Sequence, residues 1–377
     1  MTLHVVQANL LPAPERRAHA EVLDQWHSLV DIAEIAASAG VRVSVVQASS
    51  RQDHLVRNGI EYHFADVAGS RDAPERSRRF AALLSGIGAD VLHVHGLAFA
   101  GDAFAVSRRL PRMPILCQDH ADRPPRWWRR RPWKRWYAAV SGVSFTAAEQ
   151  AQRFIDAGVF AKDMQVFAIP ESSSRFTPGD RERARSGTGL HGDPCVLWVG
   201  HLNRGKDPLT VIDGVARAAL QLPDLQLWCV FGTAPLLGEV QDLIRARPQL
   251  AGRVHLLGKV PHAHVEALMR AADLFVSGSR AEGCGYSLLE ALACGATPVV
   301  TDIPAFRALT GDGAIGRLWP PGDAVRLAEA LVDTASNRPS PGQVRGYFDA
   351  NLSFAAIGRR WLDAYAWVLD GHARGAR

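Results

Sequence analysis

Two glutamates bracket a glycine-containing loop in the second half of the chain. Glu282 follows the apolar run 274–277, Glu290 lies in the second turn of a helical pattern, and Gly283 and Gly285 stand between them. Glycines let main-chain amides approach a ligand, and the helix N-terminus behind them favours a phosphate group. An ionised carboxylate can accept two hydrogen bonds from a sugar or ribose diol. Either glutamate alone is more simply a solvated residue, but the combination after a strand favours a ligand site.

Histidines form a second group of candidates, in the first half of the chain. His93 and His95 are two residues apart in a predicted strand, so both point to the same face. As a pair they could bind a metal ion, but no third ligand of suitable spacing accompanies them, so metal binding is the less favoured interpretation. His93, inside the strand, is more simply a core residue than His95, beside Gly96. His120 follows the next predicted strand.

A basic and aromatic segment, 126–137, holds four of the ten tryptophans, and no acidic residue occurs from 123 to 148. Three interpretations compete: helices with the indoles packed inward, a membrane or lipid-linked acceptor surface, and a single-stranded nucleic-acid site. Proline at 124, 125 and 132 interrupts any long helix, which limits the membrane argument. A face of tryptophan side chains could instead stack on an acceptor sugar. We expect a peripheral membrane contact as an option and no nucleic acid.

Composition narrows the class of protein. The 377 residues suggest about two domains, and 47% hydrophobic with 21% charged residues exclude a disordered or fibrous chain. The net charge of +5 is weak support for an anionic partner. The five scattered cysteines form no C-x-x-C pair, and the chain has no signal-like start and no apolar run of about 18 residues. We expect a cytoplasmic protein, with a peripheral position at the inner face of the membrane as an option.

Short apolar segments alternate with helical periodicity in both halves of the chain, as in βαβ units around a parallel sheet. The predicted strands and helices are 3–7, 21–38, 41–47, 79–85, 91–94 and 115–118 in the first half, and 195–199, 209–220, 226–231, 236–246, 253–257, 264–272, 274–277, 288–293 and 297–301 in the second. This predicts an α/β chain of two doubly wound Rossmann-like domains, with ligands in a cleft outside the carboxyl ends of the strands.

The segment 170–194 is polar and rich in glycine and proline, which is typical of a linker. Residues 354–368 have the pattern of an amphipathic helix that must pack on another element. The expected limits are 1–170 for the first domain, 171–193 for the linker, 194–350 for the second domain and 351–377 for the C-terminal helix.

In its motifs and their order the chain resembles the family 4 glycosyltransferases, which have the GT-B fold. Glu282 and Glu290 match the E-x7-E signature of that family, and 199–206 match its G-R-L-x-x-x-K strand and loop. Further matches follow in the family's order at 230–235, 257–258, 271–273, 295–302 and 319–323, and in the first half at 90–96 and His120. The resemblance implies two Rossmann-like domains that face each other across a cleft, with the C-terminal helix packing back on the first.

The resemblance also implies the activity: transfer of a sugar from a nucleotide-sugar donor, bound by the second domain, to an acceptor bound by the first. Transfer would proceed with retention and without a metal or other cofactor. Lys206 would neutralise the diphosphate leaving group, Glu282 would contact the transferred sugar and His95 would lie near the reacting carbon, which makes these three the expected catalytic residues. The expected donor-binding residues are His201, Arg204, Lys206, Glu282, Gly283, Cys284, Gly285, Tyr286, Ser287 and Glu290, the last through the ribose hydroxyls. On the acceptor side we expect His120, Trp127 and Trp128.

Three positions depart from the family's pattern. His201 stands where an arginine usually binds the diphosphate, with Arg204 as a nearby substitute; the loop 8–14 lacks a glycine-rich turn; and 169–174, with Glu171, replaces the usual P-N-G-x-D turn. These departures keep one alternative open, a catalytically inactive or repurposed nucleotide-sugar-binding protein. A GT-B nucleotide-sugar epimerase is a further alternative, because the same fold hosts such enzymes, but the E-x7-E spacing disfavours it. A phosphorylase is disfavoured because no pyridoxal lysine motif is present, and a nicotinamide dehydrogenase because no G-x-G-x-x-G follows the first strand of either half. A polysaccharide, a glycolipid and a small molecule all remain candidate acceptors.

Overall fold

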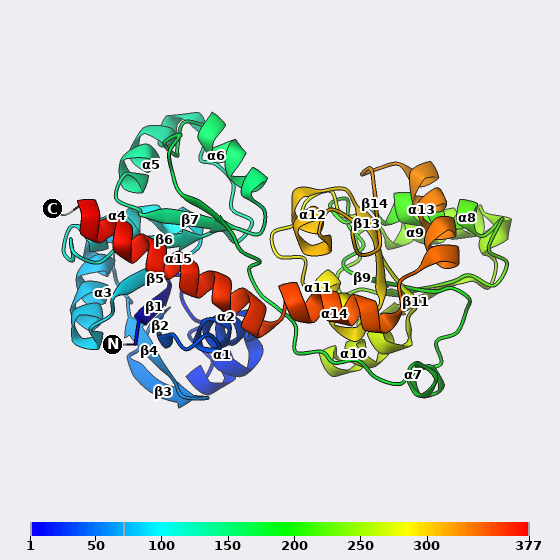
Figure 1. Ribbon diagram of the computed structural model, residues 1–377, viewed down its shortest axis with the longest axis horizontal. Coiled ribbons are helices and arrows are strands. Elements are labelled where there is room, and N and C mark those ends of the chain that lie inside the picture. The colour runs from blue at the N-terminus through cyan, green and yellow to red at the C-terminus, as the bar shows by residue number, and fades with distance from the viewer. Residues whose placement is uncertain (1, 71, 376–377) are drawn as a thin grey trace. The chain divides into compact units, whose positions relative to one another are not determined.

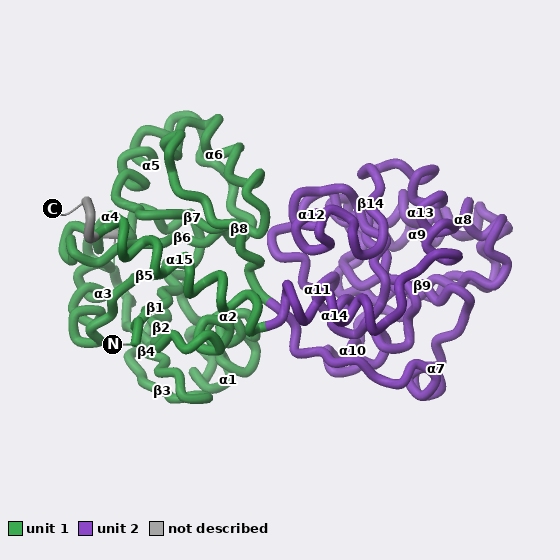
Figure 2. Tube along the Cα trace, in the orientation of Figure 1, with its two compact units in different colours: residues 1–172, 354–377 green, residues 173–353 purple. Residues whose placement is uncertain are grey.

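The computed structural model describes residues 2–70 and 72–375 and divides into two compact units (Figures 1 and 2). Unit 1 consists of residues 1–172 and 354–377, and unit 2 of residues 173–353. Each unit is built on its own sheet of largely parallel strands with helices packed against it. The predicted fold class, two doubly wound Rossmann-like α/β sheets, is confirmed.

The sheet of unit 1 has eight strands in the order β3-β4-β2-β1-β5-β6-β7-β8. All neighbours are parallel except the hairpin of β3 and β4, which turns at Asn58 and Gly59, both at positive φ. The central strands consist almost wholly of buried residues, because helices cover both faces. The strands are β1 (His4–Asn9), β2 (Arg42–Ser49), β3 (Asp53–Arg57), β4 (Ile60–Asp66), β5 (Val91–His95), β6 (Ile115–Gln118), β7 (Gly142–Phe145) and β8 (Val166–Ala168).

Two hydrophobic clusters lie on opposite faces of this sheet. Consecutive residues of a strand point to opposite faces, and the consecutive residues Val5 and Val6 of β1 belong to different clusters. One cluster joins the sheet to α3 (Ala73–Ile87), α4 (Ala100–Ser107), α5 (Arg130–Tyr137) and α6 (Gln152–Asp156). The other joins it to α1 (His19–Gln25), α2 (His27–Ala37) and α15 (Phe354–Gly375). The short 3-10 helices are η1 (Leu97–Phe99), η2 (Trp127–Arg129) and η3 (Ala148–Ala151).

The C-terminal helix α15 belongs to unit 1, although 181 residues of unit 2 precede it in the chain (Figures 1 and 2). It packs along α2, and Trp361 and Tyr365 are fully buried in the cluster beneath it. The two helices approach so closely that a Cβ at Gly358 would lie 2.4 Å from the carbonyl oxygen of Ile35. The expectation that the C-terminal helix packs on the first domain is therefore confirmed.

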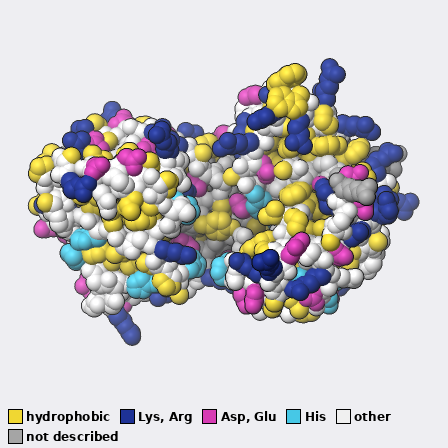
Figure 3. Space-filling view, turned by 180° about the vertical axis from the view of Figure 1, so that it is seen from behind, with side chains coloured by type: hydrophobic (Ala, Val, Ile, Leu, Met, Phe, Trp, Pro, Cys, Tyr) yellow, Lys and Arg dark blue, Asp and Glu magenta, His cyan; other side chains and the backbone are white. Residues whose placement is uncertain are grey.

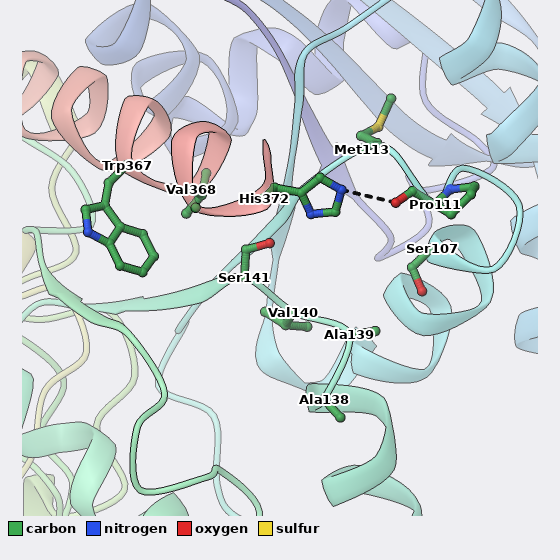
Figure 4. Close-up of a pocket in the computed structure, with 11 residues that line it drawn as sticks. Ser107, Pro111, Met113, Ala138, Ala139, Val140, Ser141, Trp367, Val368 and His372 are labelled. Carbon is green, nitrogen blue, oxygen red and sulfur yellow. Dashed lines mark hydrogen bonds between the residues drawn. The ribbon is translucent and has the colours of Figure 1, made fainter. Parts of the chain in front are cut away.

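The far part of α15 borders a cavity of about 630 Å³ (Figure 4). Trp367, Val368 and His372 of the helix face the segment 138–141 and Met113 across it, and Nε2 of His372 lies 3.1 Å from the carbonyl oxygen of Pro111. No residue expected at the site from the sequence lines this cavity.

The sheet of unit 2 has six parallel strands in the order β11-β10-β9-β12-β13-β14. They are β9 (Cys195–Val199), β10 (Gln226–Val230), β11 (Val254–Gly258), β12 (Leu274–Ser277), β13 (Thr297–Thr301) and β14 (Arg317–Trp319). The helices are α7 (Arg181–Thr188), α8 (Pro208–Ala218), α9 (Leu237–Arg245), α10 (His262–Ala271), α11 (Tyr286–Cys294), α12 (Pro304–Thr310), α13 (Ala324–Asn337) and α14 (Pro341–Asn351), with the 3-10 helix η4 (Pro248–Leu250).

Three details differ from the sequence-based expectations. The helix expected at 21–38 is two helices, because Trp26 adopts a non-helical φ of −94° and ψ of 67°. The segment expected as a linker contains α7, which Asp180 caps and whose Arg181 and Arg185 form ion pairs with Asp273. Five strands had no prediction, β3, β4, β7, β8 and β14, because several are only three or four residues long and β3 is an exposed edge.

Among the described residues, no helix combines the length and the apolar character needed to cross a membrane.

Candidate active site

The donor-side residues expected from the sequence lie on two loops of unit 2. The loop from β9 to α8 carries His201, Arg204 and Lys206, and the loop from β12 to α11 carries Glu282. Strands β9 and β12 are parallel neighbours, so both loops leave the same edge of the sheet. The strand order also reverses between them, which is the position where open α/β sheets bind ligands.

A glycine allows these two loops to touch. A Cβ at Gly278 would lie 3.1 Å from the carbonyl oxygens of both Lys206 and Asp207. Beyond this contact, the amide of Arg280 donates to the carbonyl of Gly205 over 2.9 Å, and the guanidinium of Arg280 pairs with Asp207 at 2.7 Å. The loops are therefore tied together before any ligand binds.

Lys206 and Glu282 form an ion pair through Nζ and Oε1. The hydroxyl of Ser279 donates to the same carboxylate oxygen over 2.6 Å. Both side chains are partly exposed, at 28% for Lys206 and 14% for Glu282, so a ligand can reach them. The structure thus brings together the two residues to which the sequence assigned the diphosphate and the transferred sugar.

The helix α11 begins directly after this pair. Its N-cap residue, Gly285, has a φ of 74°, and a Cβ there would lie 3.0 Å from Leu309, so both the backbone and the space favour glycine. The side chain of Cys284 is buried, whereas that of Tyr286 is 37% exposed. The first amides of a helix have no partner within it, so this end suits an anion. Gly283 and Ser287, also expected to bind the donor, are partly buried in the same segment.

Glu290, one turn further along α11, is held by a residue that the sequence did not single out. Its Oε1 lies 2.7 Å from Nε2 of His262, the first residue of α10. The side chain of Glu290 is 14% exposed and that of His262 is 59% exposed. No spacing in the sequence relates the two positions, because the contact depends on how α10 and α11 pack.

His201, which replaces the family's arginine, faces solvent beside Gly232. Its Nδ1 accepts a hydrogen bond from the amide of Thr233 over 3.1 Å, so the neutral ring carries its proton on Nε2. Arg204 is exposed on the same loop. Both residues therefore lie on the loop that carries Lys206.

In unit 1, three histidines and a glutamate form a continuous chain of contacts. Nδ1 of His95 lies 3.1 Å from Nε2 of His120, and Nδ1 of His120 lies 2.7 Å from a carboxylate oxygen of Glu171. The ring of His93 stacks on that of His95 at 4.5 Å, and its Nδ1 lies 2.8 Å from the hydroxyl of Tyr365. The sequence noted Glu171 only as a departure from a common turn, and did not connect it with His120.

Burial and charge separate the protonation behaviour of these rings. Burial, with the nearby histidines, lowers the pKa of His93 to about 3 and that of His95 well below its usual value. Burial alone would also lower the pKa of His120, but the hydrogen bond and charge of Glu171 and the charges of Asp122 and Asp119 outweigh it and raise that pKa. His120 is therefore the ring of the three that most readily carries a positive charge.

His93 is expected to make unit 1 sensitive to acid. Its folded pKa of about 3 lies below the 6.5 of an unfolded chain, so its contribution is present above pH 6.5 and is lost as the pH falls toward 3. Between about pH 7.5 and pH 5, we expect His93→Gln to lose about 2 kcal/mol less stability than the wild type, as measured by urea unfolding. Equal losses in the two proteins would show that His93 does not titrate in this way.

The basic and aromatic segment 126–137 has both an inward and an outward side. Trp133 and Tyr137 are buried against the sheet, as the packing interpretation expected, but Trp127 and Trp128 are 74% and 54% exposed. The two exposed indoles touch edge to face at 5.6 Å, and Arg126 lies over the ring of Trp128. On the part of unit 1 visible in Figure 3, basic side chains lie beside hydrophobic ones.

Within the described residues, one group of three potential metal ligands has its atoms within 4.8 Å of one another, namely His54, Glu61 and His63. It lies on the β3–β4 hairpin, and none of the expected site residues belongs to it. His93 and His95 are not part of such a group.

The fold and the paired loops of unit 2 define a nucleotide-sugar-dependent glycosyltransferase of the GT-B class. The chain belongs to the glycosyltransferase family 4 and group 1 family: the model described as Glycosyltransferase Family 4 matches residues 26–168, and that described as Glycosyl transferases group 1 matches residues 193–337. The resemblance drawn from the motifs is confirmed.

Curated relatives match most of the chain. The phosphatidyl-myo-inositol mannosyltransferase of Mycobacterium tuberculosis (strain ATCC 25618 / H37Rv) is 26% identical over 328 residues, which is 82% of this chain and 83% of the relative. The GDP-mannose:cellobiosyl-diphosphopolyprenol alpha-mannosyltransferase of Xanthomonas campestris is 25% identical over 339 residues, 87% of this chain and 86% of the relative.

Among solved structures, Anabaena Alr3699/HepE in complex with UDP matches with a TM-score of 0.69 and 19% identity, covering 97% of this chain and 100% of that one. The sucrose-phosphate synthase of Thermosynechococcus elongatus matches with a TM-score of 0.69 and 18% identity, covering 98% and 100%. At these identities the two structures establish the fold alone.

Proposed function

We propose that this enzyme transfers mannose from GDP-mannose, with retention and without a metal ion, to a lipid-linked acceptor at a membrane surface. The observation that carries the donor site is the contact of Lys206 with Glu282 at the N-terminus of α11, one turn before Glu290. Lys206 and the helix amides suit a diphosphate, Glu282 suits the transferred sugar, and Glu290 suits the ribose. The mannosyl and lipid parts of the proposal are supported by the names of the two curated relatives.

In this proposal, donor binding opens the ion pair of unit 2. The diphosphate takes the place of Glu282 beside Lys206, and the released carboxylate accepts hydrogen bonds from the sugar hydroxyls. As the bond from the sugar to phosphate breaks, negative charge grows on the diphosphate, and Lys206 stabilises it more strongly than it does the bound donor. Glu290, oriented by His262, accepts hydrogen bonds from the ribose hydroxyls.

The donor site can be tested by nucleotide-dependent stabilisation in the presence of a metal chelator. With GDP at about a hundredfold excess over its Kd, we expect the melting temperature to rise by about 5 to 10 °C. Glu290→Ala should abolish this rise, whereas Glu329→Ala, on the exposed face of α13, should keep it. If UDP raised the melting temperature instead of GDP, the donor would be a UDP-sugar. If none of GDP, UDP, ADP and CDP raised it, the result would favour an inactive or repurposed protein.

The acceptor proposal is supported by the exposed indoles of η2 and by the basic side chains around them. Indoles settle at the boundary of a bilayer, and each lysine or arginine near an anionic surface contributes about 1 kcal/mol to binding. The relatives act on a phosphatidyl-inositol and on a diphosphopolyprenol, according to their names, and both are anionic lipids.

A basic cavity of about 680 Å³ lies beside these indoles in unit 1. Arg108, Arg109 and Arg129 line it, and none of the three has a carboxylate partner among the described residues, whereas Arg76 is paired with Asp102. Because Arg129 belongs to η2 with Trp127 and Trp128, a lipid headgroup that enters the cavity would keep the indoles at the surface. This arrangement supports an anionic membrane as the surface on which the acceptor is met.

Vesicle binding checks the acceptor proposal. We expect the protein to bind vesicles that contain phosphatidylglycerol, to bind phosphatidylcholine vesicles weakly, and to lose affinity as salt is added. The double variant Trp127→Ala, Trp128→Ala should bind these vesicles at least about tenfold more weakly than the wild type does. Trp367→Ala, which removes another exposed indole of unit 1, should bind as the wild type does. Equal binding to both vesicle types would contradict the proposal, and preferential binding of a single-stranded oligonucleotide would replace it.

A further inference from the structure

We propose that Glu171 is a positioning residue: acting through His120, it holds His95 in the tautomer with its proton on Nε2, so that His95 donates a hydrogen bond to a sugar substrate at unit 1. The proposal rests on the proposed function for the identity of that ligand. The geometry on which it stands, the chain from Glu171 through His120 to His95, lies entirely within unit 1.

Both nitrogens of His120 are occupied. Nδ1 lies 2.7 Å from a carboxylate oxygen of Glu171, which can only accept, so Nδ1 must carry a proton. Nε2 lies 3.1 Å from Nδ1 of His95. This second contact needs one proton, which comes from one ring or the other.

The protonation state of His120 decides which ring supplies that proton. A cationic His120 donates its Nε2 proton to Nδ1 of His95, and the single proton of the neutral His95 then lies on Nε2. A neutral His120 instead accepts from Nδ1 of His95, and Nε2 of His95 is then a bare acceptor. One proton on His120 therefore converts the outer nitrogen of His95 from an acceptor into a donor.

The outer nitrogen of His95 is available to a ligand. It has no hydrogen-bond partner among the described residues, and it is not one of the unpaired polar atoms that are sealed from solvent, whereas Nε2 of His93 is. His93, two residues earlier in β5, stacks its ring on that of His95 at 4.5 Å and fixes its plane. The ring of His95 thus has one nitrogen committed to His120 and one facing outward.

The charges around the pair favour the cationic state of His120. Glu171 follows β8, and Asp119 and Asp122 lie on the turn after β6, where Ala121 adopts a φ of 62°. The rings of His95 and His93 on β5 also lie near His120, but they are neutral and add no opposing positive charge. Arg153 of α6 is paired with Asp119 and does not contact His120. Burial raises the pKa of Asp119 to about 6, so this carboxyl is largely ionised near neutral pH. Glu171 is the carboxylate in direct contact with the imidazole.

Glu171→Gln tests the proposal, because glutamine keeps an acceptor for Nδ1 of His120 and removes only the charge. In protein labelled with ¹⁵N-histidine, we expect His120 to titrate at a lower pH in the variant, and the proton of His95 at neutral pH to move from Nε2 to Nδ1. Glu171→Asp should retain the wild-type state, and Glu21→Gln, on the exposed surface of α1, should change neither ring. Signals are assigned from His95→Gln and His120→Gln.

The same variants are then compared in sugar transfer. We expect kcat of Glu171→Gln at neutral pH to fall about tenfold to a hundredfold, and its pH profile to lose activity at a lower pH than the wild type. A wild-type His95 with its proton on Nδ1, or a His120 whose titration ignores Glu171→Gln, overturns the proposal. If the wild type transfers no sugar while the tautomer change is observed, the hydrogen-bond chain stands and the proposed function fails.

Discussion

Lys206→Met is expected to lower kcat about a hundredfold to a thousandfold while the protein remains folded. Lys206 lies on the loop between β9 and α8, in contact with Glu282, and this is where the diphosphate of the donor is proposed to bind. Removing one preorganised charge that stabilises a leaving group costs about 3 to 4 kcal/mol of transition-state stabilisation. Methionine keeps the length and the apolar stem of the side chain, so the packing of the loop should survive.

The measurement is single-turnover sugar transfer at a saturating donor concentration, together with thermal unfolding. Lys162→Met, an exposed lysine of unit 1, is the matched control and should retain full activity. The loss should fall on kcat more than on KM, because the charge acts most strongly when the sugar–phosphate bond breaks. A variant with unchanged kcat would remove Lys206 from the mechanism and would direct attention to Arg204 instead.

Trp361→Ala is expected to destabilise unit 1 by about 3 to 5 kcal/mol. Trp361 is fully buried in the cluster that α15 shares with α2 and the sheet, and its ring contacts those of Tyr365 and His93. Truncation leaves a large cavity between a helix and a sheet, where the surroundings can collapse only partly. Since a domain of this size has about 5 to 15 kcal/mol of stability in all, the loss is severe.

The matched control lies on the same helix. Trp367 is 44% exposed and meets Phe167 edge to face, so Trp367→Ala should cost about 1.5 kcal/mol or less. Urea unfolding followed by tryptophan fluorescence and circular dichroism would compare the two variants. If both lost the same small amount, α15 would not be an integral part of unit 1.

Much of the fold was predictable because its strands are continuous apolar runs. The strands at 115–118, 195–199, 274–277 and 297–301 have the predicted limits, since each is buried on both faces and is followed by aspartate or glycine. The edge strand β3 gave no such signal, because its residues are mostly exposed and only its pairing with β4 makes it a strand. The helix α7 was not predicted for a similar reason. Its charged residues are typical of a linker, and only the tertiary structure pairs Arg181 and Arg185 with Asp273.

The candidate site was likewise predictable only in part. Glu282, Glu290 and the glycines between them lie within ten residues of one another, so their spacing alone indicated a strand, a turn and a helix N-terminus. The partners of these residues come from elsewhere in the chain. Lys206 is 76 residues from Glu282, and His262 is 28 residues from Glu290.

By itself, the sequence determined the α/β class, the family and the residue types of the donor loop, because these depend on local periodicity and on short motifs. Only the tertiary structure decided that Glu171 meets His120, that His95 has one outward nitrogen, and that Trp133 is buried while Trp127 is exposed. These contacts join residues up to 51 positions apart, and in the last case depend on which side of one short segment meets the sheet. The position of a residue along a strand or helix fixes the direction of its side chain locally. Contacts between distant side chains follow from packing, which no short sequence pattern encodes.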